Sequence, residues 1–237
     1  MSARLGFVCK TVTQAAKAAE ILLAGRRAKG SVFDIDGTLL QLLVPSDAVA
    51  VGAQPGKVVA PLPEHFRFLR LAADHGCKRI HVVTARSESA HNRATTRRDL
   101  SEIGVVPFSL GMMDPIGSRE TQLDAKTRLR AVARRYDSRR EDSQLLLNVG
   151  DRITDIVDHE GMVHLCREAQ SAGNWFSETV ASADDIIVAE SMRETMGRVI
   201  TQAHACKMKK DAYVVMTGYD THSMVQIKVP SWSTGLL

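Results

Sequence analysis

The sequence predicts an α/β fold in which a parallel β-sheet is flanked by helices. Short apolar segments with strand character alternate with segments whose apolar residues recur every three or four positions. This alternation is typical of a parallel sheet that helices cover on both faces. The 237 residues, of which 44% are hydrophobic and 24% are charged, have the composition of an ordinary globular protein. Their number suits one α/β domain with a small addition.

The first third of the chain contains two predicted helices on either side of strand-like segments. Apolar residues at helical spacing indicate the helices, and a glycine turn ends the first strand. The predicted elements are a helix over 13–23, a strand over 31–36, a small hairpin that pairs 48–51 with 57–60, and a helix over 61–74.

Strands and helices alternate regularly in the middle of the chain. The strand predicted over 144–149 is almost wholly apolar, as expected for a strand that is buried on both faces. The predicted elements are a strand over 78–84, a helix over 88–103, a strand over 105–110, a basic helix over 124–136, and strands over 144–149 and 161–167.

The pattern changes after about residue 174. A long or broken helix is predicted over 182–210, and two strands over 212–216 and 224–229 flank a polar turn. We interpret this helix and hairpin as an appendage. The predicted domains are therefore a core over residues 1–180 and a C-terminal appendage over residues 181–237.

Polar residues gather where the predicted strands end. In doubly wound sheets, ligands bind beyond the carboxyl ends of the strands, so these positions are candidates for a functional site. Lys126 lies near the start of the basic helix, between the third and fourth of these strands. The strand-end residues are Asp34, Asp36, Thr84, Arg86, Asp151 and Asp155.

Four stretches of the chain, in this order, resemble the motifs of the haloacid dehalogenase (HAD) superfamily. They are Phe-Asp-Ile-Asp-Gly-Thr-Leu from Phe33, the Thr-x-Arg stretch at Thr84, Lys126, and Gly-Asp-x-x-x-Asp from Gly150. The resemblance covers roughly residues 31–167. It implies a Rossmann-like HAD fold and a magnesium-dependent phosphatase that forms a phosphoaspartate.

The resemblance implies distinct roles for the two aspartates of the first motif. On an extended strand, Asp34 and Asp36 point to the same side, and Gly37 supplies the turn that follows. Asp34 would attack phosphorus as the nucleophile. Asp36 would protonate the leaving oxygen and then activate the hydrolytic water.

The same resemblance assigns a Mg²⁺ site and a phosphate site. Asp34, Asp151 and the backbone carbonyl of Asp36 would bind Mg²⁺, with Asp155 in support. Thr84 and Lys126 would hold the phosphoryl oxygens as a hydroxyl donor and a positive charge. The residues expected to contact the substrate beside them are Gly37, Thr38, Ala85 and Arg86.

Within the superfamily, Thr84-x-Arg86 followed by Thr95-Thr96 looks like the acid-phosphatase branch and its polynucleotide 3′-phosphatase relatives. The chain departs from the acid-phosphatase pattern because Gly37 stands where those enzymes usually carry Glu. It also contains no Gly-rich Lys-Ser/Thr phosphate loop, so we expect no kinase half.

The spacing of the motifs leaves little room for a cap, which predicts an open site. We expect small phosphate esters, such as nucleotides or sugar phosphates, as substrates. The alternatives are a phosphatase for nucleic-acid 3′ ends or phosphoproteins, and a non-catalytic HAD-derived binding module. A basic set is compatible with nucleic acid, although a solvated helix face is the favoured interpretation. The set is Arg97, Arg98, Lys126, Arg130 and Arg134.

The charge and the cysteines point to a cytoplasmic protein without a membrane partner. The net charge of +4 is a modest basic excess, and no apolar run of 20 residues is present to span a membrane. The N-terminus does not read as a secretory signal, and the four cysteines are widely spaced. Scattered cysteines of this kind are typical of reduced thiols in the cytosol.

Overall fold

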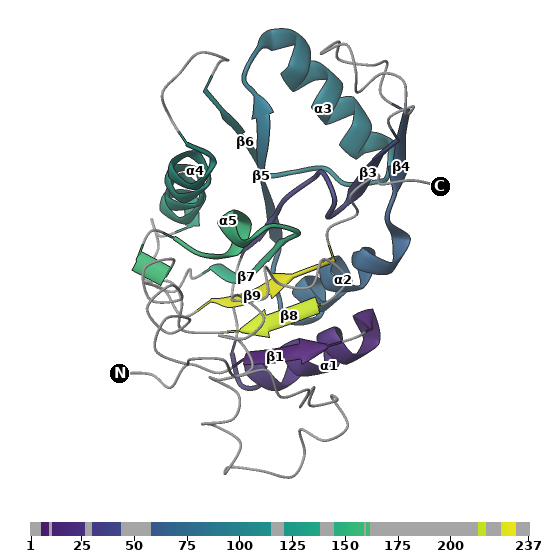
Figure 1. Ribbon diagram of the computed structural model, residues 1–237, viewed down its shortest axis with the longest axis vertical. Helices are drawn as coiled ribbons and strands as arrows, with labels where there is room; N and C mark the ends of the chain where they lie inside the picture. The colour runs from purple at the N-terminus through teal and green to yellow at the C-terminus, as the bar shows by residue number, and fades with distance from the viewer. Residues whose placement is uncertain are drawn as a thin grey trace, which may run out of the picture.

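The computed structural model describes residues 6–9, 11–26, 30–43, 58–114, 121–137, 145–158, 160–161, 213–216 and 224–230. Figure 1 shows their helices and strands. These elements are β1 (Gly6–Cys9), α1 (Val12–Leu23), β2 (Gly30–Phe33), β3 (Leu40–Leu43), β4 (Val58–Pro61), the 3-10 turn η2 (Pro63–His65), α2 (Phe66–Asp74), β5 (Arg79–Ser87), α3 (Ala90–Glu102), β6 (Ser109–Met113), α4 (Gln122–Asp137), β7 (Leu145–Gly150), α5 (Ile153–Ile156), β8 (Tyr213–Met216) and β9 (Val225–Lys228).

Most of the strands belong to one mostly parallel sheet. Among the described residues, seven strands pair in the order β1-β8-β9-β7-β2-β5-β6, and β3 and β4 form a separate antiparallel pair. The neighbours from β9 to β6 are parallel, and β8 is antiparallel to both β1 and β9. This arrangement confirms the predicted α/β class and is compatible with a Rossmann-like fold.

Helices cover both faces of the sheet. Val32 and Val83 pack with Leu129 and Ala133 of α4 on one face. Their neighbours in the strands, including Phe33, face the opposite way and pack in a larger core with α1 and α2. Figure 1 shows α4 and α5 on one side of the strands and α1 and α2 on the other. The middle strands are therefore buried on both faces, which explains their apolar sequences.

The order of the strands creates a switch point between β2 and β7. From β2 the chain adds β5 and then β6 on one side of the sheet, and it later adds β7 and β9 on the other side. At such a point the connections leave in opposite directions and open a crevice beyond the carboxyl ends of the strands. Asp34 follows β2 and Asp151 follows β7, so the fold brings these two residues to that crevice.

The four helices predicted over 13–23, 61–74, 88–103 and 124–136 are confirmed as α1, η2 with α2, α3, and α4. Among the described helices, none combines the length and the apolar character that crossing a membrane requires.

The strand predicted over 105–110 lies later in the chain than expected. Val106 is 81% exposed, and Phe108 is half exposed. Pro107 has no N–H to donate to a ladder, so pairing with β5 begins only at Ser109 opposite His81. The predicted position was therefore wrong, because β6 runs from Ser109 to Met113.

The hairpin expected from residues 48–51 and 57–60 has a different first strand. β4 pairs with β3, and Leu40 is opposite Pro61. The chain turns back directly after Gly37, whose N–H donates to the carbonyl of Leu40 at 2.8 Å. Leu39 and Leu40 are buried and anchor this turn. Residues 48–51 lie outside the described residues.

The C-terminal strands belong to the main sheet rather than to an appendage. β9 pairs in parallel with β7, and β8 pairs with β9 and β1. Every residue of β8 and β9 is buried, as expected for strands inside a covered sheet. The predicted boundary at residue 180, the helix over 182–210 and most of the strand over 161–167 lie outside the described residues.

Candidate functional site

Three aspartates form a buried acidic cluster at the carboxyl ends of β2 and β7. Asp34, Asp151 and Asp155 are 6%, 7% and 3% exposed. One carboxylate oxygen from each lies within 4.8 Å of the others. The backbone N–H of Asp34 donates to the carbonyl of Val149 at 2.9 Å, which continues the pairing of β2 with β7. The sheet itself therefore sets the first two carboxylates side by side.

Lys126 of α4 reaches into this cluster. Its side chain is 3% exposed, and its Nζ lies 2.5 Å from Oδ1 of Asp34 and 2.7 Å from Oδ1 of Asp155. It also donates to the carbonyl of Val83 on β5 at 3.3 Å. One ammonium group therefore bridges two of the three carboxylates. The sequence predicted Lys126 at the site, and the structure brings it there.

The cluster carries more negative charge than Lys126 neutralises. Burial and the neighbouring Asp155 raise the pKa of Asp34 well above its usual range, although Lys126 opposes them. Burial and Asp155 also raise the pKa of Asp151 to about 7. Burial lowers the pKa of Lys126, but the two carboxylates more than offset it and the pKa is raised. Three clustered carboxylates in this electrostatic setting fit a hard divalent cation, which prefers oxygen ligands.

Two glycines allow the acidic residues to approach so closely. Gly37 has φ +80°, and a Cβ there would lie 2.6 Å from Oδ2 of Asp151. A Cβ on Gly150 would lie 2.1 Å from Cβ of Asp155. A side chain at either position would push an aspartate out of the cluster. Glycine at position 37, where the acid-phosphatase pattern has Glu, is therefore required by the packing of this chain.

The carboxylate of Asp36 lies outside the acidic cluster and binds Arg86 of β5. Nε and Nη2 of Arg86 donate to the two oxygens of Asp36 at 2.9 and 2.7 Å. Nη1 donates to Oδ2 of Asp99 at 2.8 Å and to Oγ1 of Thr96 at 3.1 Å, both on α3. Burial lowers the pKa of Arg86, but these two carboxylates raise it above its ordinary value. Arg86 is therefore a fixed cation beside Asp36.

The other predicted residues lie in β5 and in the turn that follows β2. Thr84 is buried near the end of β5, and its Oγ1 accepts a hydrogen bond from the N–H of Arg86 at 3.2 Å. Ala85 lies between them and is partly exposed. Thr38 is fully buried, and its carbonyl lies 2.7 Å from Nδ1 of the buried His65. Contacts of these residues with a substrate stay predictions.

The part of the basic face of α4 that lies nearest the acidic cluster is buried rather than solvated, whereas Arg134 farther along the helix is partly exposed. Lys126 and Arg130 are each 2% exposed. Nη1 of Arg130 donates to the carbonyls of Thr154 and Asp155 at 2.8 and 2.7 Å, and Nη2 donates to the carbonyl of Val157. The guanidinium group holds the turn after β7 in place. Lys126 and Arg130 therefore act from within the protein.

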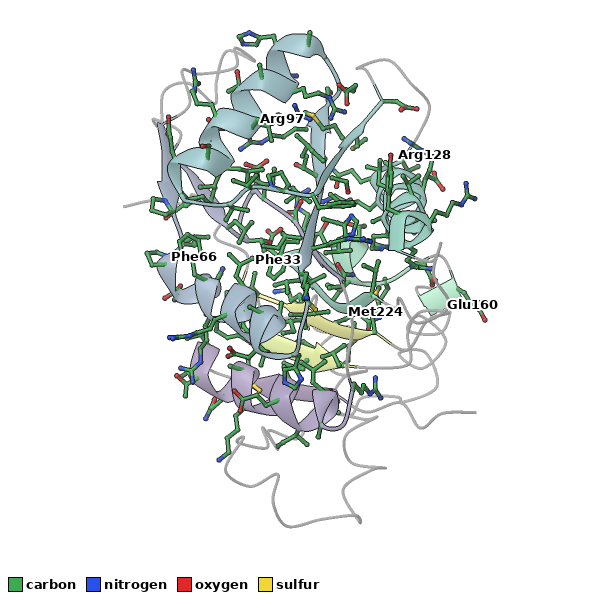
Figure 2. The ribbon with its side chains drawn as sticks, turned by 180° about the vertical axis from the view of Figure 1, so that it is seen from behind. Phe33, Phe66, Arg97, Arg128, Glu160 and Met224 are labelled. Atoms are coloured by element: carbon green, nitrogen blue, oxygen red, sulfur yellow. The ribbon has the colours of Figure 1, made fainter. Side chains whose placement is uncertain are left out.

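Two exposed arginines among the described residues lie away from the acidic cluster. Arg97 projects from α3 and Arg128 from the outer side of α4, as Figure 2 shows. Neither belongs to the acidic cluster, and Arg128 instead donates to Asp114 at 3.1 Å.

Sequence reasoning missed Asp99 and Lys228. Asp99 is a buried acid in a polar helix, and its partner Arg86 lies 13 positions earlier. Lys228 ends β9 in register with Gly150, is 3% exposed, and its charge acts on Asp151. Asp34 and Asp151 were located because each is a polar residue at the end of an apolar strand. Lys228 follows Ile227 at the end of β9, so the same signal would have located Lys228.

No family model matches the chain, and no curated protein matches it. Among solved structures, the chain is weakly similar to a chain in the structure of a Pnkp1/Rnl/Hen1 complex. The two share 18% sequence identity with a TM-score of 0.36. The alignment covers 53% of this chain and 39% of that chain. A likeness of this size supports no conclusion about the function of this protein.

Proposed function

We propose that this protein is a magnesium-dependent phosphomonoesterase of the HAD type, with Asp34 as nucleophile and Asp36 as general acid and base. The observation that carries the proposal is the bridging of Asp34 and Asp155 by Lys126. This arrangement lies at the switch point of a doubly wound sheet, where ligands bind. A buried carboxylate beside both an ammonium group and further carboxylates suits a nucleophile for an anionic substrate better than it suits a structural ion pair.

Asp34, Asp151 and Asp155 would hold Mg²⁺ through their carboxylate oxygens, a donor set that fits this ion. Bound there, Mg²⁺ would offset the negative charge of the cluster and of the phosphate group. Lys126 supplies a second positive charge, held 2.5 Å from the proposed nucleophile. Its contact with Val83 fixes the direction from which the ammonium group acts.

The reaction proceeds in two displacements at phosphorus. In the first, a carboxylate oxygen of Asp34 forms a bond to phosphorus while the bond from phosphorus to the leaving oxygen breaks, and Asp36 donates a proton to that oxygen. In the second, water attacks phosphorus and gives a proton back to Asp36. The bond between Asp34 and phosphorus then breaks, which releases orthophosphate and restores both side chains.

Small phosphate esters are the proposed substrates. Between the first two motifs, the described residues form only the β3-β4 pair, η2 and α2. None of these described elements is a separate helical cap, and we propose that the site is open. A polynucleotide needs a row of exposed positive charges along its backbone. The two basic residues of α4 nearest the cluster, Lys126 and Arg130, are buried and do not offer such a row.

The proposal is tested by hydrolysis of p-nitrophenyl phosphate by the wild type and by Asp34→Asn, each with Mg²⁺ and with excess EDTA. We expect activity only in the wild type with Mg²⁺, because the amide is nearly isosteric but does not attack phosphorus. Circular dichroism of Asp34→Asn checks that the fold is intact. Wild-type activity in the Asp34→Asn variant would refute the proposed nucleophile, and full activity in EDTA would refute the metal requirement.

A further inference from the structure

A single side chain, Arg86, joins the proposed general acid to the helix α3. Two of its nitrogens hold both oxygens of Asp36, and the third holds Asp99 and Thr96. The side chains of Arg86 and Asp99 are 7% and 6% exposed, whereas that of Asp36 is 37% exposed. The contacts of Arg86 with α3 are therefore buried, whereas its contact with Asp36 is partly open to solvent at the site.

The geometry of the guanidinium group makes the two ends dependent on each other. The group is planar, and its donors point in fixed directions. Once Nη1 is held by Asp99 and Thr96, the directions of Nε and Nη2 are set as well. These two donors then fix the plane of the Asp36 carboxylate. Each Asp36 oxygen retains a second lone pair, so the contact with Arg86 leaves a position for the transferred proton.

The half-exposed Asp36 has no other hydrogen-bond partner that holds its side chain among the contacts of the described residues. A carboxylate on the surface rotates freely unless such a partner holds it. Its alignment with a leaving oxygen therefore depends on Arg86, and the alignment of Arg86 depends on α3. Asp99 provides the charged contact at that end, and its second oxygen lies 4.0 Å from the exposed Arg98.

We propose that Asp99 is a positioning residue for proton transfer, acting through Arg86 on the carboxylate of Asp36. This inference rests on the proposed function, because it concerns the general acid of that reaction. Thr96 has the same role with a weaker, uncharged contact. Removing the charge of Asp99 lets the guanidinium group turn, and the Asp36 carboxylate loses its alignment with the leaving oxygen.

The effect should depend on how much the leaving oxygen needs a proton. An alkoxide is a poor leaving group, so an alkyl phosphate requires general-acid help that contributes about 10²–10⁴-fold. A dinitrophenolate leaves without a proton. Misalignment of Asp36 should therefore lower kcat/KM for an alkyl phosphate and leave kcat/KM for 2,4-dinitrophenyl phosphate nearly unchanged. kcat/KM is the relevant constant because it reports the steps up to phosphorylation of Asp34.

The experiment compares Asp99→Asn with Glu102→Gln, which makes the same acid-to-amide change on the same helix at a side chain that is 68% exposed. We expect Asp99→Asn to lower kcat/KM about 10–100-fold for the alkyl phosphate and less than about threefold for the dinitrophenyl ester, a fraction of the full general-acid contribution. Glu102→Gln should match the wild type on both substrates. Equal losses on both substrates, or no loss on either, would overturn the proposal.

A double-mutant cycle separates positioning from a general structural effect. In the Asp36→Asn background, Asp99→Asn should cause no further loss with the alkyl phosphate, because the group that it positions is already absent. Full additivity would overturn the proposal. If Asp99→Asn does not fold, Thr96→Val decides by the same substrate comparison, with a smaller loss confined to the alkyl ester expected. Failure of the proposed function is seen separately, as activity retained in Asp34→Asn.

Discussion

Replacing Gly37 with alanine would perturb the site through one methyl group. The Cβ would lie 2.6 Å from Oδ2 and 2.8 Å from Cγ of Asp151. An ordinary van der Waals contact is about 3.5 Å, so the carboxylate must move by roughly 1 Å. Position 37 also has φ +80°, which costs an L-residue about 1–2 kcal/mol. The substitution therefore combines backbone strain with displacement of a proposed metal ligand.

Gly104 offers a matched control for the strain. It has φ +76°, and a Cβ there would have no atom within 4 Å. Gly104→Ala should lower the free energy of unfolding by about 1–2 kcal/mol and leave phosphatase activity unchanged. Gly37→Ala should cost at least as much stability. It should also lower kcat/KM by about 10²-fold, because a misplacement of about 1 Å at a reacting centre has that effect.

The assay is hydrolysis of p-nitrophenyl phosphate over a Mg²⁺ titration, with the melting temperature of each variant measured in parallel. We expect Gly37→Ala to require more Mg²⁺ than Gly104→Ala for half of its maximal activity. If the two variants retained equal activity, the close approach of Gly37 to Asp151 would have no bearing on the site. That result would contradict the expected displacement of Asp151 even if both variants lost the same stability.

Three further perturbations follow from the contacts and charges of the site. Lys126→Met should lower kcat for p-nitrophenyl phosphate by at least about 10²-fold through loss of a preorganised charge, and equal kcat in the variant would contradict its role. Arg130→Met should lower the free energy of unfolding by about 3–5 kcal/mol, because three backbone carbonyls lose a buried charged donor. Chemical denaturation measures this free energy, and a change below about 1 kcal/mol would contradict the prediction. The pKa of Asp151 is raised to about 7, so between the ordinary carboxyl pKa and about 7 this carboxyl group holds more protons in the folded protein than in the unfolded chain. Asp151 therefore makes the metal-free protein less stable as pH rises through that window. Mg²⁺ competes with these protons, so it should raise the melting temperature more at about pH 8 than at about pH 5, and an equal rise at both would contradict this reading.

The parts of the structure that the sequence predicted depend on local patterns. The strand before Asp34 and the strand before Asp151 are apolar runs closed by acids, and a parallel sheet brings such ends to one edge. Lys126 followed from its place near the start of a basic helix together with the resemblance to the HAD motifs. These signals lie within a few neighbouring residues, so no knowledge of long-range packing was needed to find them.

The parts that were missed depend on contacts between distant segments. β9 pairs with β7 through residues such as Val225 and Leu147, and nothing local distinguishes this partner from another strand. Arg130 was predicted to be a surface residue because the carbonyls that accept its hydrogen bonds belong to residues 154–157, far away in the sequence. Asp99 became visible only when Arg86 was seen to bind Asp36 and α3 at once.

The proposed function depends above all on transfer of phosphate to Asp34. The direct measurement is to quench the wild type with acid during turnover of p-nitrophenyl phosphate and to treat it with borohydride, which reduces an aspartyl phosphate to homoserine. Mass spectrometry of the peptide that contains residue 34 then identifies the modified position. We expect homoserine at position 34 in the wild type and none in Asp34→Asn. Homoserine at another aspartate, or none during active turnover, would contradict it.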